Sequence, residues 1–387
     1  MKNTKYNFLL FFINPTIGAL SALFYYEDKR KLNSSLWLFF SFLFGFFYIP
    51  VSDNSDYFTY YQRLELISEF DLNEFISFLK DQVDYVSWIV LYLFSLIDVS
   101  FNFIWGLISF VYGFLVLKII RNVKKYYELN NITFTNLKKI LLLAFIFVIS
   151  LYLIYNFRFW IGTLFLFLGI TYISLENNKK MLLCFLFASL FHFALVPSII
   201  VFLIAKYIRI NLYILAILCI CTLFFNFKGL LVENIIYIFE QYLGTRVSYI
   251  SDNYIESYNN NLKSLNFYVY GFEKILYYTI LFTIILNLKE LNLKSSKLEK
   301  KNFSIILLYY SFINLTLALP LSERFVKIVV GLGLLSLLYT TIKFKTKYHT
   351  LLYFTCFLYI LVECRKLIET LNPGLFLPTG VFSFLFD

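Results

Sequence analysis

Charged residues are scarce in this chain. Asp, Glu, Lys and Arg together make up 15% of the 387 residues, whereas a soluble domain carries about 25%. Hydrophobic residues make up 60% of the chain. Apolar runs of about 20 residues, the length that spans a bilayer as a helix, recur along the whole length. This composition excludes an ordinary soluble enzyme and indicates a chain that stays in the lipid bilayer.

Motifs for cofactors and metal ions are also lacking. The sequence has no glycine-rich phosphate loop, no serine–histidine–aspartate set and no zinc-site spacing. We therefore expect no metal ion, no cofactor, no disulfide framework and no ATP-driven transport. The five cysteines, four of them within apolar runs and none with metal-site spacing, are Cys184, Cys219, Cys221, Cys356 and Cys364.

The apolar runs are continuous and do not alternate with polar residues, which is typical of helices and not of a transmembrane β-barrel. The expected fold class is all-α: a polytopic transmembrane helical bundle of roughly 10–13 spans plus re-entrant or half helices. We expect one integral membrane domain over residues 1–387. The first span is expected to be retained, with a kink at Asn14-Pro15. The expected spans lie near 6–24, 34–50, 101–120, 140–156, 159–175, 211–228, 268–287, 303–320, 325–342 and 350–363.

Basic residues are concentrated in a few segments between these runs. These segments contain 21 Lys and Arg residues, and only six Asp and Glu residues lie in or next to them. The rest of the chain, leaving aside Lys2 and Lys5, contains 11 basic and 18 acidic residues. Loops rich in Lys and Arg stay in the cytoplasm, so the net charge of +10 indicates membrane orientation and not nucleic-acid binding. The segments predicted to be cytoplasmic are 27–31, 118–139, 177–180, 206–209, 288–301 and 343–347.

This orientation constrains two ambiguous apolar segments. Both ends of 181–205 are predicted to be cytoplasmic, so this segment is expected to form a short hairpin or re-entrant loop, with Pro197 helping to break it. Segment 83–97 cannot cross alone, and the flanking Asp81, Asp84 and Asp98 suit a half-helix on the outer side.

Two long segments are predicted to be extracytoplasmic. They are 51–82, with an interfacial helix expected at 64–80, and 229–267, which is rich in Tyr and Asn.

Arginines at predicted outer turns are candidates for binding an anion, because a charge at the membrane is costly and needs a reason. Arg158 lies midway through the apolar stretch 140–175, where we expect a turn between two spans. Arg324 follows Glu323 in a short outer turn, and Arg246 lies in the loop 229–267. The alternatives are an interfacial anchor for Arg158, a local ion pair for Arg324 and a solvated charge for Arg246.

His192 is one of two histidines and lies in the middle of 181–205. Imidazole exchanges protons near neutral pH, which suits a general base. The alternative is a packed histidine with satisfied hydrogen bonds.

Acids outside the second span are candidates for accepting hydrogen bonds from sugar hydroxyls, for acting as a base or for binding a cation. Asp53 and Asp56 share a helix face if their segment is helical. The alternative is helix capping by Ser52 or Asp53, with Asp56 in the first turn. Asp56 is the rival of His192 as the catalytic base.

Four segments together resemble a known family. They are PVSDNSDYFTYY after the second span, VDYVSWIVLYLFSLI, NFRFWIGTLFLFLGITYIS, and ENNKKMLLCFLFASLFHFALVPSII. In this order they resemble the EpsG-like branch of the Wzy-type polymerases that join the repeat units of bacterial O-antigen or capsule. Family members more often have Gly-Thr-Asp before the tyrosine and Arg-Gln-x-Ala at the arginine. Asp56, Arg158 and His192 match position by position.

The resemblance implies a GT-C-like bundle in the bacterial inner membrane, with an active site that faces the periplasm. The implied substrates are undecaprenyl-diphosphate-linked glycans, and a chain-length regulator is an implied partner. His192 and Asp56 are then the catalytic candidates, and Arg158, Arg324 and Arg246 bind the diphosphate. The candidates for sugar binding are Asp53, Tyr57 and Glu323. Two alternatives stay open: a flippase or transporter of lipid-linked oligosaccharides, and a membrane glycosyltransferase of the O-antigen ligase type.

Overall fold

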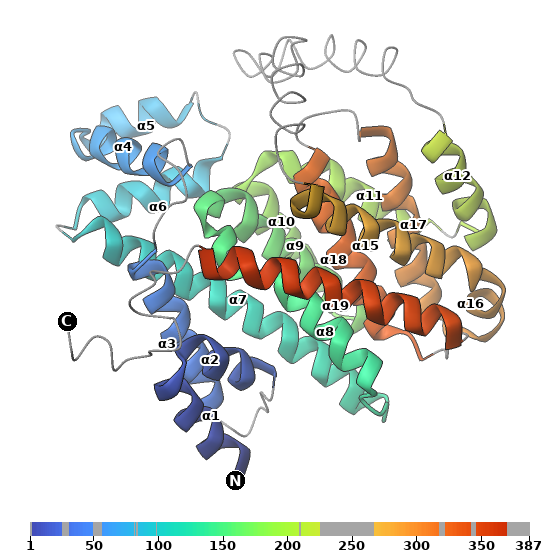
Figure 1. Ribbon diagram of the computed structural model, residues 1–387. Helices are drawn as coiled ribbons and strands as arrows, with labels where there is room; N and C mark the ends of the chain where they lie inside the picture. Colours follow the sequence, from blue (N-terminus) through green and yellow to red (C-terminus); the bar gives the residue numbers. More distant parts are fainter. Residues whose placement is uncertain are drawn as a thin grey trace. The chain divides into compact units, whose positions relative to one another are not determined.

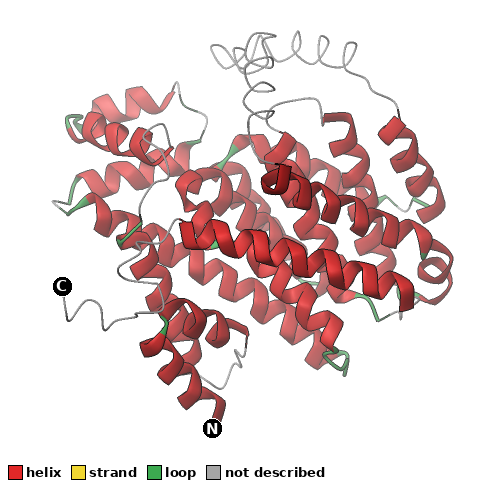
Figure 2. Cartoon of the chain, in the orientation of Figure 1, coloured by secondary structure: helices red, strands yellow, loops and turns green. Residues whose placement is uncertain are grey.

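Every described element is a helix (Figure 2). The computed structural model describes residues 2–24, 31–48, 56–80, 82, 84–97, 99–208, 210–224, 267–316, 322–341 and 346–369, and these ranges contain no strand. Within them, two helical stretches are long and apolar enough to cross a membrane: Phe101–Leu129, and Asn136–Ser174, which includes a 3₁₀ segment at Leu151–Asn156. A third crosses if the bent pair Gly271–Leu286 and Leu288–Lys294 is one span. The all-α membrane bundle is confirmed, and the total number of spans stays a prediction.

The helices group into two compact units that are interleaved along the chain. Figure 1 labels the helices and colours them by their place in the sequence. The first unit comprises Met1–Thr133, Ile149–Pro197 and Glu363–Asp387, and the second comprises Phe134–Val148 and Ser198–Val362. Helices of the first unit are α1 (Lys2–Ile13), α2 (Pro15–Phe24), α3 (Lys31–Phe46), α4 (Asp56–Ser68), α5 (Leu72–Lys80), α6 (Tyr85–Ser95), α7 (Phe101–Leu129), α9 (Phe157–Ser174) and α10 (Asn178–Phe191). Those lying wholly or mainly in the second are α8 (Asn136–Val148), α11 (Val196–Tyr207), α12 (Leu212–Phe224), α15 (Phe267–Leu286), α16 (Leu288–Lys294), α17 (Lys297–Thr316), α18 (Ser322–Tyr339) and α19 (Thr346–Glu369).

Close packing of α3 on α7 forms the base of the first unit. A Cβ atom added to Gly45 would lie 2.4 Å from the carbonyl oxygen of Trp105, and one added to Gly113 would lie 2.2 Å from Ser41 Oγ. The backbones approach this closely because glycine has no side chain, as is common between membrane helices. Trp37 Nε1 also donates a hydrogen bond to the carbonyl of Gly113 at 2.8 Å.

The first apolar run is a helical pair and not the single span that its length predicts. The break falls at Asn14, so the expected disruption at Asn14-Pro15 is confirmed. α2 packs against α1, and a Cβ atom on Gly18 would lie 2.4 Å from the Cα of Phe11. With 12 and 10 residues, neither helix reaches the roughly 30 Å of a bilayer core at about 1.5 Å per residue.

The long apolar stretch around Arg158 also differs from its prediction. We expected two spans joined by a turn at Arg158. Instead α8 ends at Val148, a 3₁₀ helix runs from Leu151 to Asn156, and α9 begins at Phe157. Arg158 is therefore the second residue of a helix, and the interruption lies before it.

Two other breaks agree with the orientation argument. Segment 181–205 is not one helix: α10 ends at Phe191, His192 is extended with φ −154° and ψ 109°, and α11 begins at Val196. Pro197 does not make the break, since it lies in the first turn of α11, where its missing N–H costs nothing. α6 has 11 residues, about 16 Å of helix, which is a half-helix length as expected.

The segment 51–82 contributes α4 and α5 in place of one interfacial helix over 64–80. The second begins with a reciprocal cap: the backbone N–H of Glu74 donates to Asp71 Oδ1 at 2.8 Å, and that of Asp71 donates to Glu74 Oε2 at 2.9 Å. Phe75 of α5 stacks on Tyr92 of α6, with ring centroids 4.0 Å apart. Segment 229–267 lies, except for its last residue, outside the described residues.

In the second unit, three parts of the chain meet at the end of α18. Lys138 and Glu299 belong to segments predicted to be cytoplasmic, and Thr341 lies just before another such segment. Lys138 Nζ donates to the backbone carbonyls of Leu337, Leu338 and Thr340. Glu299 Oε1 accepts from the backbone N–H of Thr341 at 2.5 Å and from its hydroxyl at 2.8 Å. A lysine on the last carbonyls satisfies groups that the helix leaves unpaired.

Candidate active site

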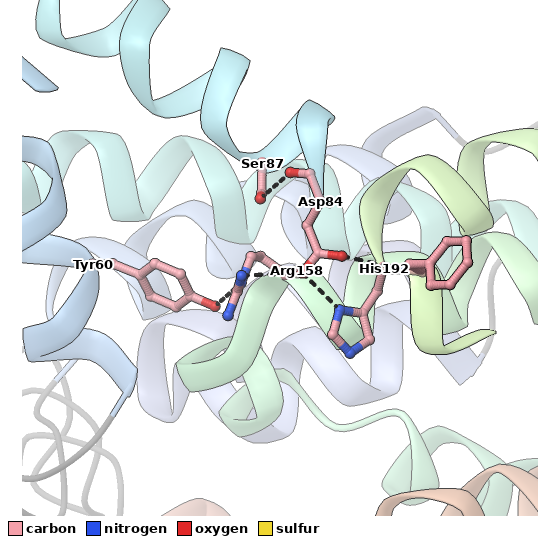
Figure 3. Close-up of polar contacts among 6 residues, drawn as sticks. Tyr60, Asp84, Ser87, Arg158 and His192 are labelled. Carbon is pink, nitrogen blue, oxygen red and sulfur yellow. Dashed lines mark hydrogen bonds and ion pairs between the residues drawn. The ribbon is translucent and has the colours of Figure 1, made fainter. Parts of the chain in front are cut away.

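Asp84 is the centre of a polar cluster in the first unit (Figure 3). Its side chain is 2% exposed, and its Oδ2 lies 3.1 Å from Arg158 Nη1 and 3.1 Å from His192 Nδ1. Its Oδ1 accepts the backbone N–H of Phe193 at 3.1 Å. One buried carboxylate therefore joins α6, the start of α9 and the break between α10 and α11.

The start of α6 aims this carboxylate away from its own helix. Asp84 occupies the N-cap position, but its side chain makes no capping hydrogen bond. Its carbonyl instead accepts from the hydroxyl of Ser87 at 2.7 Å. The side chain of an N-cap aspartate normally accepts a hydrogen bond from a backbone N–H in the first turn of its own helix. The contacts of Asp84 with other helices therefore indicate a role other than capping.

Arg158 is held on two sides. Its Nε donates to the hydroxyl of Tyr60 at 2.9 Å, and its Nη1 donates to Asp84. The guanidinium carbon also lies 5.5 Å from the centroid of the Tyr60 ring. Nη2 has no partner among the described residues, and the side chain is 17% exposed. This fixed guanidinium therefore keeps donors available for an anion.

His192 is an extended residue between α10 and a 3₁₀ helix over Phe193–Leu195. Because a carboxylate only accepts hydrogen bonds, we assign the proton of the neutral imidazole to Nδ1, which faces Asp84. Nε2 is then the basic nitrogen, and it has no partner among the described residues. The ring packs edge-on against Phe159, with centroids 5.4 Å apart.

The electrostatics keep Asp84 ionised. Asp84 lies outside the two candidate spans. Burial by itself raises the pKa of this carboxyl, but the hydrogen bond and charge of His192, the charge of Arg158 and the N–H of Phe193 outweigh it. The net result is a pKa of about 2, below the ordinary value of 3.8. A permanently charged Asp84 suits the stabilisation of positive charge on a neighbouring imidazole.

Aromatic packing fixes the other end of the cluster. Tyr60 is 1% exposed and lies against Phe157 and Trp105, with ring centroids 4.7 and 5.8 Å away. Trp105 belongs to α7, whose packing on α3 forms the base of this unit. The hydroxyl that receives Arg158 is therefore held by the core.

The structure brings together two of the predicted site residues, Arg158 and His192. Asp56 lies in the first turn of α4, one turn before Tyr60. Burial raises the pKa of the Tyr60 phenol, and the nearby charge of Asp56 raises it further. Tyr57 is 9% exposed; its hydroxyl donates to Asn102 at 3.3 Å, and its ring packs on Trp105. This burial leaves little of the Tyr57 ring for a sugar.

The remaining predicted residues lie elsewhere. Arg324 and Glu323 are in the first turn of α18, in the second unit. Asp53 and Arg246 lie outside the described residues. Among the described residues, no three His, Cys, Asp or Glu side chains are grouped as metal ligands are.

Asp84 is the residue that sequence reasoning missed. The sequence shows it only as one of three acids that flank segment 83–97. The available signal was its place directly before an apolar helix, where an acid needs a partner if it is buried. Its partners Arg158 and His192 lie 74 and 108 residues later in the chain, and no local sequence pattern predicts such pairs.

Of the comparisons with known proteins, only the one with family models gives a match. No curated protein matches the chain, and no solved structure matches it. The model of the EpsG family matches residues 31–372, which include Tyr60, Asp84, Arg158 and His192. Because this match covers most of the sequence, the chain belongs to the EpsG family.

Proposed function

We propose that this chain polymerises undecaprenyl-diphosphate-linked oligosaccharide repeat units into O-antigen or capsular polysaccharide. The reaction takes place on the outer face of the bacterial inner membrane. Membership of the EpsG family, which is associated with glycosyltransferase-like polymerases, supports a polysaccharide polymerase-like role. The donor, the acceptor and the side of the membrane are parts of the proposal.

The observation that carries the proposal is the joining of Arg158 and His192 through Asp84. Transfer of a glycan from a lipid diphosphate requires a base for the attacking hydroxyl and positive charge for the leaving diphosphate. Here one buried carboxylate holds a guanidinium and an imidazole, and each of the two keeps a nitrogen without a partner among the described residues. That pairing matches the two requirements.

The proposed step is one displacement. A hydroxyl oxygen of the acceptor's non-reducing sugar bonds to the anomeric carbon of the donor glycan. The bond from that carbon to the diphosphate oxygen breaks, and undecaprenyl diphosphate leaves with the electron pair. The hydroxyl proton passes to His192 Nε2, while Asp84 accepts the hydrogen bond from Nδ1 and stabilises the imidazolium. Arg158 donates to the developing negative charge through Nη2.

Asp56 has a different proposed task. Its place in the first turn of α4, one turn before Tyr60, puts a carboxylate near the cluster. A carboxylate there suits hydrogen bonds to the hydroxyls of the acceptor sugar. Loss of such a contact raises KM for the acceptor, whereas loss of a base lowers kcat.

The test of the proposed function is deletion of the gene followed by electrophoresis of the surface glycan. We expect the ladder to collapse to a single repeat unit, restored by the wild-type gene and not by Arg158→Ala. Arg158→Lys should restore it poorly, because an ammonium cannot form the two-pronged contact with phosphate. Loss of all surface glycan would contradict the proposal and indicate a flippase or a ligase.

A further inference from the structure

A second buried carboxylate lies outside the cluster and has no part in the proposed step. The side chain of Glu363 is 0% exposed and lies on α19, in the part of that helix that belongs to the first unit. Its Oε2 accepts a hydrogen bond from the hydroxyl of Tyr152 at 2.7 Å, and its Oε1 accepts one from Lys366 Nζ at 2.7 Å. Burial of a carboxylate among apolar residues is costly, so the place of Glu363 needs a reason.

Tyr152 lies in the 3₁₀ helix Leu151–Asn156, directly before the helix that carries Arg158. α8 ends at Val148, and Ser150 is extended with φ −66° and ψ 148°, so the helical path from α8 is broken there. The 3₁₀ helix then continues into α9 without an intervening loop residue. The helical segment that carries Arg158 therefore begins with the 3₁₀ helix and is separated from α8 by an extended residue.

The start of this segment is not held by capping side chains. Ser150 is the N-cap of the 3₁₀ helix and Asn156 is the N-cap of α9, and neither makes a side-chain capping hydrogen bond. Such bonds commonly hold helix starts. Here the hydroxyl of Tyr152 bonds to Glu363, whose other oxygen is held by Lys366. A hydrogen bond to an ionised group is stronger than a neutral one, so this contact ties the start of the segment to α19.

The position of Arg158 depends on where the segment starts. Arg158 follows Tyr152 by six residues, roughly 10 Å along a 3₁₀ and then an α-helix. Because helical dihedral angles are fixed, a shift or rotation at Tyr152 carries the first turn of α9 with it. Arg158 has to contact Tyr60 and Asp84 and keep Nη2 directed at the diphosphate. A misplacement of about 1 Å at a reacting group can cost about a hundredfold in rate.

We propose that Glu363 is a positioning residue, which holds the start of α9 through Tyr152 so that Arg158 can contact Asp84 and the diphosphate together. This inference rests on the proposed function, because it assigns a role in that reaction. Glu363 itself contacts neither the substrate nor the reacting atoms. Its effect on the reaction passes through Arg158, which distinguishes it from a residue that only stabilises the fold.

A double-mutant cycle with purified full-length protein and lipid-linked repeat units tests the dependence on Arg158. Tyr152→Phe removes only the hydroxyl and should lower kcat by about ten- to a hundredfold with KM for the acceptor nearly unchanged. Glu363→Gln keeps an acceptor oxygen but loses the charge, so its effect should be smaller. In Arg158→Lys protein, Tyr152→Phe should lower the remaining rate by less than about threefold, because the guanidinium that it positions is already gone.

The matched control is Tyr309→Phe, which removes another buried hydroxyl, 2.9 Å from Ser198 Oγ in the second unit. It should lower the melting temperature about as much as Tyr152→Phe does and leave kcat unchanged. A Tyr152→Phe protein with the wild-type kcat, or the same fold loss of rate in wild-type and Arg158→Lys backgrounds, overturns the assignment of Glu363.

Hydrogen exchange measures the positioning without relying on turnover. Backbone amides of residues 151–160 should exchange about tenfold faster in Tyr152→Phe than in wild type, while those of α6 stay unchanged. Unchanged exchange at 151–160 overturns the inference whatever the rates are. A folded wild type that joins no repeat units overturns the proposed function instead, so the two failures are distinguishable.

Discussion

Replacing Asp84 by Asn tests the centre of the site. The substitution keeps the size of the side chain but removes the charge, and it places an NH₂ group where Arg158 and His192 both donate. The pKa of Asp84 is lowered from 3.8 to about 2, which corresponds to roughly 2–3 kcal/mol of favourable interaction of the ionised carboxylate. Because the side chain is 2% exposed, solvent screens little of this free energy.

We expect Asp84→Asn to lower the free energy of unfolding by at most about that amount near neutral pH, because the part due to the charge of His192 is present only when the imidazole is protonated. The sign of the pH dependence follows from the lowered pKa. The stabilisation is present above the ordinary value of 3.8 and is lost as the pH falls through about 2. Melting curves in detergent should therefore separate wild type from Asp84→Asn at pH 6 and bring them together toward pH 2.

The effect on the reaction should be larger. Without Asp84, His192 loses the partner that fixes its tautomer, so the chemical step should slow by about 10²–10⁴-fold. The assay is the initial rate of polymerisation of purified lipid-linked repeat units. Glu69→Gln, which removes an exposed acid directly after α4, is the control and should keep the wild-type rate. A folded Asp84→Asn protein with the wild-type rate would refute the role assigned to Asp84.

Three further predictions concern the site, the second unit and the orientation. Tyr60→Phe removes the acceptor of Arg158 Nε and should lower the polymerisation rate by about tenfold with a small change in melting temperature; an unchanged rate would show that this hydrogen bond is dispensable. Lys138→Met leaves the carbonyls at the end of α18 without their donor and should destabilise the protein by about 1–3 kcal/mol, measured as a lower melting temperature; an equal or higher one would contradict this. Cysteines at positions 69 and 294 should react differently with an impermeant reagent on intact cells, labelling at 69 only; labelling at 294 alone would invert the predicted orientation.

Sequence predicts those parts of the site that carry a local signal. Arg158 and His192 are polar residues within long apolar stretches, and the distribution of basic segments required a break near His192, which the structure contains. The position of that break was misassigned to Pro197, because proline in the first turn of a helix is as well accommodated as proline at an interruption.

Tertiary contacts decide what the sequence pattern leaves open. Asp84 pairs with residues 74 and 108 positions away, and hydrophobic periodicity contains no information on such pairs. Residues 6–24 have the length and composition of one span, yet α2 packs against α1, and Gly18 permits the close contact with Phe11. Composition fixes the membrane class, whereas packing determines which apolar runs cross as single helices.

Reconstitution of the purified protein with its substrate tests the central claim most directly. Lipid-diphosphate-linked repeat units are incubated with wild type and with Arg158→Ala, and both the glycan ladder and the released lipid diphosphate are measured. We predict that wild type forms a ladder and releases one lipid diphosphate for each repeat unit joined, and that Arg158→Ala does neither. Unchanged repeat units with folded wild-type protein, or equal ladders from both proteins, would contradict the account.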